Sequence, residues 1–464
     1  MNKIVFVLIS LLLFGSVASG KITLPPVFGD HMVLQQQAKV SVWGYSTPGA
    51  KVKLISSWNK KKYQAFVDNS GIWVLEISTP VAGGPYEIVM NDGEELILHN
   101  ILIGEVWVCS GQSNMEMPLR GNSSPVLNAN DIILNAENPS IRLFKVGRAT
   151  SLNSQLNCKG TWQECTPQTA REFSAVAYQF GEMLQKKLNV PVGLIMSAVG
   201  GTMIESWMSS NSLQAFPEVK VPKSLDTLKA PHKEPTALYN AMIAPLTKFA
   251  IRGVIWFQGE SNRHEPMLYG KLFPVLVADW RKQWNIGDFP FYYVQIAPFG
   301  STDKTRSGPL LREAQLNAMC IIPNCGMASA MDVGMEKDIH FMDKTTPARR
   351  LAYWALAQTY GIKGIGFQGP MYKSMKTDEN RAIVSFDFAP YLTSYRKPLS
   401  LFEVAGEDKI FHPAKAEINA NQVIVQSKEV AHPVAVRYAF KEWVVGELYN
   451  NDGLPASSFR TDNW

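Results

Sequence analysis

The sequence has little of several features that mark whole classes of proteins. It contains five cysteines in 464 residues, with neither a C-x-x-C pair nor an H-E-x-x-H motif, so we expect no metal and no other cofactor. Lysine and arginine number 45 against 40 acidic residues and form no long basic run, which gives no argument for nucleic acid binding. Beyond the N-terminus no apolar run reaches the roughly 20 residues that cross a bilayer, so no membrane span is expected.

The first 20 residues are typical of a secretory signal peptide. A basic start, MNK at 1–3, precedes an apolar stretch over 4–14 and a small-residue cleavage site, VASG at 17–20. The apolar stretch is too short for a transmembrane anchor. We therefore expect the mature protein to be exported, to the periplasm, the cell surface or the medium.

Export permits disulfide bonds, and two cysteine pairs are close enough in sequence to form them. Cys158 can pair with Cys165, and Cys320 with Cys325, although spacing alone does not decide the pairing. Cys109 lies inside an apolar run and is expected to be a buried thiol.

The pattern of turns and apolar runs divides the chain into three parts after the signal peptide. Residues 21–103 contain short strands separated by turn dipeptides, which is typical of a β-sandwich. Residues 104–362 alternate between strands and helices, and residues 363–464 return to short strands. We predict a catalytic α/β domain with a parallel sheet, flanked by an N-terminal and a C-terminal β module.

The α/β part contains strand-like runs that end in polar loops. A parallel sheet covered by helices on both faces binds its ligand outside the carboxyl ends of its strands. Polar residues should therefore follow the strands, and four loops satisfy this rule: the loops beginning at Gln112, at Gly200 and at Gln258, and the loop from Asp332 to His340. Such repetition is hard to explain as packing alone.

Ser113 is the candidate nucleophile. It follows the apolar run VWVC at 106–109 and precedes residues that can open a helix, so its hydroxyl should lie at the edge of the sheet beside unpaired backbone N–H groups. That position suits acyl transfer, because the same N–H groups can hold the oxyanion. The alternative is that Ser113 merely caps a helix.

A serine nucleophile needs a base and an acid that orients it. Of seven histidines, His340 alone follows a strand of the sheet and has a carboxylate, Asp338, two residues earlier. We predict His340 as the base and Asp338 as its orienting acid. His264 is the next candidate base, and Asp332 is the alternative acid.

The oxyanion needs two or three fixed donors. The Ser113 N–H, the N–H groups of Gly200 and Gly201, and a side-chain amide from Gln258 or Asn262 are the candidates. A double glycine can also be a plain tight turn. The polar residues expected to face the substrate are Gln112, Asn114, Glu260 and Asn262, although Glu260 could instead hold its own loop.

These loops resemble the signature blocks of the sialate O-acetylesterases, a branch of the SGNH-type esterases with a flavodoxin-like core. The matching blocks are GQSNM at 111–115, VGGT at 199–202, WFQGESN at 256–262 and DIH at 338–340. The resemblance extends over nearly the whole mature chain, including LPPVFGDHMVLQQ at 24–36 and LYNNDGLPASSFRTDNW at 448–464. It implies Ser113 as nucleophile, Asp338 and His340 as its partners, and oxyanion donors in the glycine and Gln258 blocks.

The chain departs from the wider SGNH pattern in two places. Asp338 and His340 are one residue closer than in the D-x-x-H of many SGNH esterases, which leaves the orienting acid open. A Gln-Gly-Glu block stands where a G-x-N-D asparagine is usual, which leaves the third oxyanion donor open.

The sequence therefore predicts an exported serine esterase that removes acetyl groups from sugar hydroxyls, with 9-O-acetylated sialic acid as the first candidate. An esterase for acetylated xylan or another glycan is the alternative, and a non-catalytic carbohydrate-binding protein is the second alternative. Because sialic acid carries a carboxylate, a cation near the cleft is expected. Those closest to the predicted loops in sequence are Arg120, Arg263 and Arg349.

Overall fold

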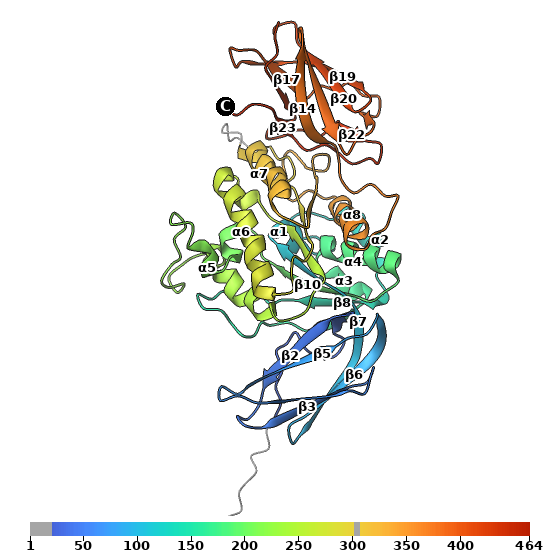
Figure 1. Cartoon of the computed structure of the whole chain (residues 1–464), viewed down its shortest axis with the longest axis vertical. Coiled ribbons are helices and arrows are strands. Elements are labelled where there is room, and N and C mark those ends of the chain that lie inside the picture. Colours follow the sequence, from blue (N-terminus) through green and yellow to red (C-terminus); the bar gives the residue numbers. More distant parts are fainter. Residues whose placement is uncertain (1–20, 301–306) are drawn as a thin grey trace, which may run out of the picture.

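The computed structural model of the protein describes residues 21–300 and 307–464. The predicted signal peptide, residues 1–20, lies outside the described residues. The chain forms three bodies stacked along its long axis: an N-terminal β module, a central α/β body and a C-terminal β module (Figure 1). No helix of the described part is long and apolar enough to cross a membrane.

The N-terminal module is built mainly from antiparallel strands whose inner faces share one apolar core. In β3, Val52 and Leu54 are buried while Lys51 and Lys53 are exposed, because successive side chains of a strand point to opposite faces. β2 pairs with β5, and β3 pairs with β4 and β6. The strands are β1 (Val33–Gln35), β2 (Lys39–Tyr45), β3 (Lys51–Ser56), β4 (Lys62–Phe66), β5 (Ile72–Ser78) and β6 (Gly83–Asn91).

One long strand, β7 (Glu95–Gly111), connects this module to the central body. Its first half is antiparallel to β6, and its second half is parallel to β10 (Val192–Ala198) and β11 (Gly253–Phe257). The sequence changes accordingly, from partly exposed side chains at the start of the strand to unbroken burial over 101–111. The predicted boundary between residues 103 and 104 therefore falls inside a continuous strand.

The central sheet has the strand order β13-β12-β11-β7-β10-β8-β9. The five strands from β10 to β13 are parallel. Read in that direction, β10-β7-β11-β12-β13, they are the second, first, third, fourth and fifth of the five along the chain. β8 continues the sheet in parallel beside β10, and β9 closes it antiparallel, so the predicted parallel sheet is mixed at one edge. The new strands are β8 (Asn138–Lys145), β9 (Trp162–Cys165), β12 (Phe291–Val294) and β13 (Cys325–Ala328).

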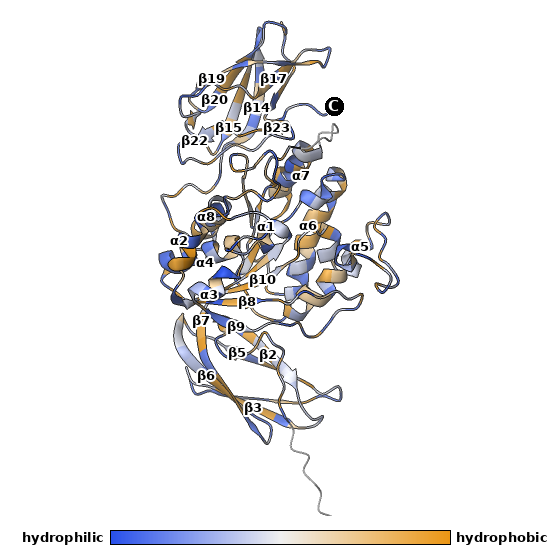
Figure 2. Ribbon diagram, turned by 180° about the vertical axis from the view of Figure 1, so that it is seen from behind, coloured by the Kyte–Doolittle hydropathy of each residue, from blue (hydrophilic) through white to orange (hydrophobic). Residues whose placement is uncertain are grey.

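Helices cover both faces of the sheet, as Figures 1 and 2 show. In β11, Ile255 and Phe257 enter the core that contains α4 and α8, while Val254 and Trp256 enter the core that contains α6. The covering helices are α4 (Ala175–Leu188), α6 (Pro266–Trp284), α7 (Ser307–Ile321) and α8 (Thr345–Trp354). At the end of α8 the chain changes into a π-turn, Ala355–Thr359. The short helices are α1 (Ser113–Glu116), α2 (Ala129–Leu134), α3 (Pro167–Arg171) and α5 (Ser210–Leu213).

The C-terminal module consists of two antiparallel four-stranded sheets, one two-stranded sheet and an apolar core. It is attached to the central body through α7, where the buried guanidinium of Arg312 donates to Ser458 Oγ (3.1 Å) and to the Lys441 carbonyl (2.6 Å). The strands are β14 (Met371–Asp378), β15 (Arg381–Asp387), β16 (Leu392–Thr393), β17 (Phe402–Ala405), β18 (Phe411–Pro413), β19 (Lys415–Asn419), β20 (Gln422–Gln426), β21 (Ala435–Tyr438), β22 (Tyr449–Asn450) and β23 (Phe459–Arg460).

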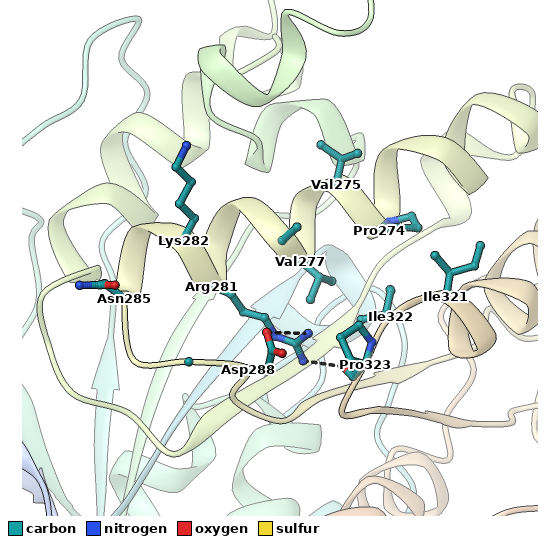
Figure 3. A pocket seen from close by; sticks show the side chains of 12 residues that line it. Pro274, Val275, Val277, Arg281, Lys282, Asn285, Asp288, Ile321, Ile322 and Pro323 are labelled. Carbon is teal, nitrogen blue, oxygen red and sulfur yellow. Dashed lines mark hydrogen bonds and ion pairs between the residues drawn. The ribbon is translucent and has the colours of Figure 1, made fainter.

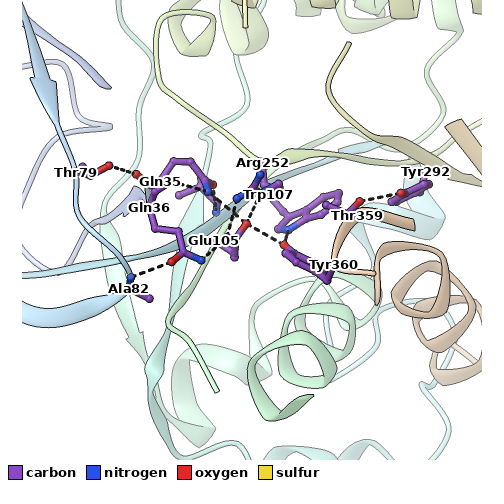
Figure 4. A network of polar contacts seen from close by, with 11 residues as sticks. Gln35, Gln36, Thr79, Ala82, Glu105, Trp107, Arg252, Tyr292, Thr359 and Tyr360 are labelled. Carbon is purple, nitrogen blue, oxygen red and sulfur yellow. Dashed lines mark hydrogen bonds and ion pairs between the residues drawn. The ribbon is translucent and has the colours of Figure 1, made fainter. Parts of the chain in front are cut away.

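A buried polar network surrounds Glu105, in β7 near the lower end of the central sheet (Figure 4). The Arg252 guanidinium donates to both Glu105 oxygens at 2.6 and 3.0 Å, and the Tyr360 hydroxyl donates to Oε2 at 2.9 Å. Gln35, the last residue of β1, and the next residue, Gln36, donate to the same carboxylate. The network thus joins the N-terminal module, β7 and the turn after α8.

The five cysteines are all free thiols, so neither predicted disulfide is present. Cys158 and Cys165 are buried, while Cys320 is exposed on α7 and Cys325 begins β13. Cys109 is buried as expected, and burial alone raises its pKa, which keeps it protonated.

Candidate active site

Ser113 is the first residue of α1, directly beyond the end of β7. The turn is tight because Gly111 packs on β11: a Cβ on this glycine, whose φ is +137°, would lie 2.1 Å from the Phe257 carbonyl oxygen. Only glycine fits there. The turn leaves the Ser113 N–H in the first turn of a helix, where backbone donors have no intrahelical acceptor.

His340 lies beside Ser113, although 227 residues separate them in the chain. The distance from His340 Nε2 to Ser113 Oγ is 2.9 Å, within hydrogen-bond range of a base and its nucleophile. Burial and then the nearby Lys344 lower the pKa of His340, while Asp338 opposes them. The imidazole is therefore neutral at neutral pH, the form that accepts a proton. His264, the alternative base, is exposed.

Asp338 contacts the backbone of the His340 loop more closely than it contacts the imidazole ring. Its Oδ1 accepts the His340 backbone N–H at 2.8 Å and lies 3.8 Å from Nδ1, an ion-pair distance rather than a hydrogen bond. The Ser124 hydroxyl donates to the other carboxylate oxygen. Burial raises the pKa of Asp338, but these hydrogen bonds and the neighbouring charges bring it below its ordinary value, so the group stays ionised.

Asp332, the alternative acid, is occupied elsewhere. Its two oxygens accept from the Arg350 guanidinium at 2.7 and 2.8 Å, in a fork between the end of the sheet and α8. This pair is nearly buried, with side chains 15% and 8% exposed. Asp332 therefore fastens α8, and Asp338 is the carboxylate beside the imidazole.

The glycine turn at 200–201 lies against Ser113. A Cβ on Gly200 would be 3.2 Å from Ser113 Cβ and 3.2 Å from an oxygen of Glu116. The Gly200 N–H donates to that Glu116 carboxylate at 2.7 Å. The predicted oxyanion donor at Gly200 is thus paired with an internal anion in the absence of substrate, and Gly201 follows it with a φ of +71°.

Gln258 takes a different place from the one predicted. Its side-chain amide donates to the Thr202 carbonyl at 3.0 Å and to Asn262 Oδ1 at 2.8 Å, so both hydrogens are used inside the protein. Asn262 in turn donates to Glu205 at 3.0 Å and accepts the Ile204 N–H at 2.9 Å. Both side chains are buried, and their hydrogen bonds fix the turn after β11 to the glycine loop.

The remaining residues predicted to face substrate are also buried. Gln112 Oε1 lies 3.5 Å and 3.4 Å from the N–H groups of Gly259 and Ser261, contacts at the limit of a hydrogen bond. Asn114 Nδ2 donates to Glu260 Oε1 at 2.6 Å and to the Ile339 carbonyl at 3.3 Å. Gln112, Asn114, Glu260 and Asn262 thus bind protein groups and join the loops to one another, and their contact with substrate stays a prediction.

Lys344 is a component of this region that sequence reasoning missed. It is only 1% exposed, and its ammonium donates to Asn114 Oδ1 at 2.6 Å and lies 4.1 Å above the Phe341 ring. Its spacing of four residues after His340 was the available signal, but lysine is seldom buried. Among the described residues, no cluster of side chains is suited to a metal ion.

Of the three arginines expected near the site, Arg263 lines a small pocket with Glu260 and Ile339, whereas the other two are engaged elsewhere. Arg120 pairs with Glu172 at 2.8 Å, and Arg349 lies with Gln179 and Glu182 along the outer surface of α4 and α8. Lys233 instead overhangs the glycine turn, since a Cβ on Gly201 would lie 3.8 Å from its Cε.

Two larger hollows lie away from Ser113. A hollow of about 550 Å³ between α6 and the end of α7 has mainly apolar walls (Figure 3). Another, of about 600 Å³, lies where the N-terminal module meets the central body. None of the predicted site residues lines either hollow.

Comparisons with known proteins identify the family. Residues 103–360 match the family described as "Carbohydrate esterase, sialic acid-specific acetylesterase", which is more than half of the chain. The chain belongs to the sialate O-acetylesterase family. It is 31% identical to human sialate O-acetylesterase over 93% of this chain and 90% of the relative, and 29% identical to the mouse protein over 89% and 88%.

Family membership makes the chain a carboxylic ester hydrolase of acetylated sugars. The chain is also similar to a solved structure described as a carbohydrate acetylesterase from Xanthomonas citri, and the similarity covers the whole length of that structure. The two are 35% identical, with a TM-score of 0.88 over 96% of this chain and 100% of the other. The β modules are therefore shared with that protein.

Proposed function

We propose that this protein is an exported, SGNH-type serine esterase with a flavodoxin-like core, and that its substrate is 9-O-acetylated sialic acid. The observation that carries the mechanism is the 2.9 Å contact between Ser113 Oγ and His340 Nε2, at the carboxyl edge of a sheet with the strand order of flavodoxin-like folds.

The reaction proceeds in two steps. Ser113 Oγ attacks the acetyl carbonyl carbon as its proton passes to His340 Nε2, and the imidazolium then gives that proton to the sugar oxygen as the ester bond breaks. Water attacks the acetyl-enzyme with His340 again as base, which releases acetate and restores Ser113. Asp338, ionised beside the ring, stabilises the imidazolium.

The negative charge of the tetrahedral intermediate lies between two backbone elements. The Ser113 N–H and the N–H groups of the glycine turn 200–201 are the donors on this side of the nucleophile. Because Glu116 accepts the Gly200 N–H, an oxyanion that uses this donor replaces the carboxylate there. Gln258 has no part in this step.

Two cations beside His232, Lys233 and Arg148, support an anionic sugar as substrate. Lys233 and His232 come from the 3-10 turn Pro231–Lys233, which lies in the connection between β10 and β11. Arg148 comes from the loop after β8. Burial, then Arg148 and Lys233, lower the pKa of His232, which reflects how close the three groups lie. A carboxylate on the sugar would bind Lys233 while the acetyl group faces Ser113.

Acetate release from 9-O-acetyl sialic acid and from acetylated xylo-oligosaccharides tests this proposal. Ser113→Ala should lower kcat at least about 10⁴-fold, since removing a serine nucleophile costs on that order. Lys233→Met should raise KM about 2- to 5-fold for the sialic acid alone, the effect of an exposed ion pair. Lys376→Met, on exposed β14 of the C-terminal module, is the matched control and should change neither value.

Two outcomes would contradict the proposal. An unchanged rate for Ser113→Ala would remove the mechanism. Faster turnover of the xylo-oligosaccharide, with no effect of Lys233→Met on either substrate, would retain the mechanism and assign the enzyme to neutral glycans.

A further inference from the structure

A buried cation and a buried anion flank the residue that follows the nucleophile. Asn114 accepts from the Lys344 ammonium through Oδ1 at 2.6 Å and donates from Nδ2 to Glu260 Oε1 at 2.6 Å. The exposed fractions of Lys344, Asn114 and Glu260 are 1%, 1% and 9%. Burying two charges is costly, and here the charges are held apart by an amide instead of neutralising each other in contact.

The same amide reaches the loop of the base. Asn114 Nδ2 also donates to the carbonyl of Ile339, the residue before His340, at 3.3 Å. Lys344 follows His340 by four residues and lies above Phe341, which belongs to the same loop. One side chain thus binds the histidine loop at two points, from a backbone position adjacent to Ser113.

We propose that Lys344 is a positioning residue of the esterase: through Asn114 it holds the His340 loop against the Ser113 turn. This inference rests on the proposed Ser113–His340 mechanism. Lys344 does not contact Ser113 or His340 by hydrogen bond and is closed to solvent, so it acts on the reaction through these residues and not through substrate.

The charges around His340 give the inference a measurable sign. Asp338, on the same loop, favours the protonated ring, whereas Lys344 disfavours it. Glu260 lies behind Asn114, Asp343 precedes Lys344 in the loop, and Glu116 is bound to Gly200 beside Ser113. Burial lowers the pKa of Lys344 to about 7, with Glu260 the main opposing influence. Below pH 7, where His340 titrates, Lys344 is therefore charged and repels the imidazolium.

Removing the charge should raise the pKa of His340. We expect Lys344→Met to move the acid limb of the pH profile of kcat/KM to higher pH and to lower kcat about 10- to 100-fold. KM should stay within about 2-fold, because the lysine does not face substrate. Lys344→Gln keeps a donor for Asn114 without the charge, so it should show the same pH shift with a smaller loss of kcat.

Lys344→Arg restores the charge and should return the acid limb toward its wild-type position. The pKa of His340, followed by NMR of the imidazole in the intact protein, provides a readout that does not depend on turnover. It should rise in Lys344→Met and Lys344→Gln, and less in Lys344→Arg. Ser113→Ala, assayed in parallel, decides the proposed function separately.

The proposal is wrong if a folded Lys344→Met or Lys344→Gln variant has the wild-type acid limb and the wild-type His340 pKa. It is also wrong if kcat falls only in proportion to the fraction of unfolded protein. If none of the three variants folds, Lys344 is required for stability rather than for positioning, and the inference fails.

Discussion

Two buried charged networks lie along the long strand β7, one around Glu105 within the strand and one beyond its carboxyl end. The two networks differ in how their opposite charges are arranged. Near the lower end, Glu105 and Arg252 are in direct contact through two hydrogen bonds. Just beyond the upper end, Lys344 and Glu260 are separated by the amide of Asn114. Glu260 Oε2 is buried with no hydrogen-bond partner, so this network is less fully satisfied.

The difference is reflected in the ionisation of the two cations. The hydrogen bond to Glu105 is the main cause that raises the pKa of Arg252, which therefore keeps its charge at any physiological pH. Burial lowers the pKa of Lys344 to about 7 and raises the pKa of Glu260. Direct pairing thus gives a permanent charge that serves stability, whereas separation leaves groups that can change protonation state near neutral pH, beside the proposed base His340.

Arg252→Met should have the largest effect on stability. It leaves Glu105, which is 1% exposed, without its cation, and a change of this kind costs about 3 kcal/mol of the free energy of unfolding. The pH profile of kcat/KM should not move. Urea unfolding measures the loss, and Lys39→Met, which removes an exposed ion pair with Glu76, is the control and should cost less than about 1 kcal/mol. Equal losses in the two variants would contradict the assignment.

Asp338→Asn should act on the reaction and not on the fold. We expect kcat to fall about 100-fold, in the range of general acid–base contributions. Because Asp338 raises the pKa of His340, its removal should move the acid limb to lower pH, opposite in sign to the Lys344 variants.

Asp332→Asn is the matched control, because it removes a carboxylate of the same loop that is bound to Arg350. It should reduce stability by about 2 kcal/mol and leave the acid limb unchanged. An acid limb that moves with Asp332→Asn but not with Asp338→Asn would exchange the two assignments.

The wild-type enzyme should remain active at mildly acidic pH. A base whose pKa is lowered stays unprotonated to lower pH, so kcat/KM should fall only as the pH drops through a midpoint below 6.5, the ordinary pKa of histidine. A midpoint above 6.5 would contradict this balance of burial, Lys344 and Asp338.

Glu260→Gln should have the smallest effect. The carboxylate is the main group that keeps Lys344 charged, so its loss should move the acid limb in the same direction as Lys344→Met but less far. The free energy of unfolding should change by less than about 1 kcal/mol, because an amide of the same shape replaces a carboxylate with one unpaired oxygen. A shift larger than that of Lys344→Met would contradict this order.

The arrangement of the loops could be predicted from the sequence because the rule behind it is topological. Parallel strands bring their carboxyl ends to one edge, so the residues after β7 and β13 meet whatever fills the rest of the chain. The proximity of Ser113 and His340 was predicted in this way. The edge strands β8 and β9 were not, because the buried Arg142, paired with Glu164 at 2.6 Å, interrupts the apolar pattern of β8.

The direction of side chains within the loops could not be predicted. Gln258 was expected to point at the oxyanion and instead points to Thr202 and Asn262, since the rotamer in an irregular turn depends on neighbours that are distant in sequence. Lys344 was overlooked for a related reason: its burial depends on Asn114 and Glu260, which come from two other loops. Residue type and spacing report neither contact.

Because β7 is continuous, formation of the candidate active site depends on the first hundred residues of the chain. A ribosome delivers residues 21–103 before it delivers Ser113, and the strand that carries the serine begins within that earlier segment. The N-terminal module therefore cannot be deleted without altering the strand that leads to Ser113. A chain that begins at residue 104 would lack half of this strand and the two glutamines that bind Glu105. Any exchange of modules between such enzymes would place the junction in the middle of a single β-strand.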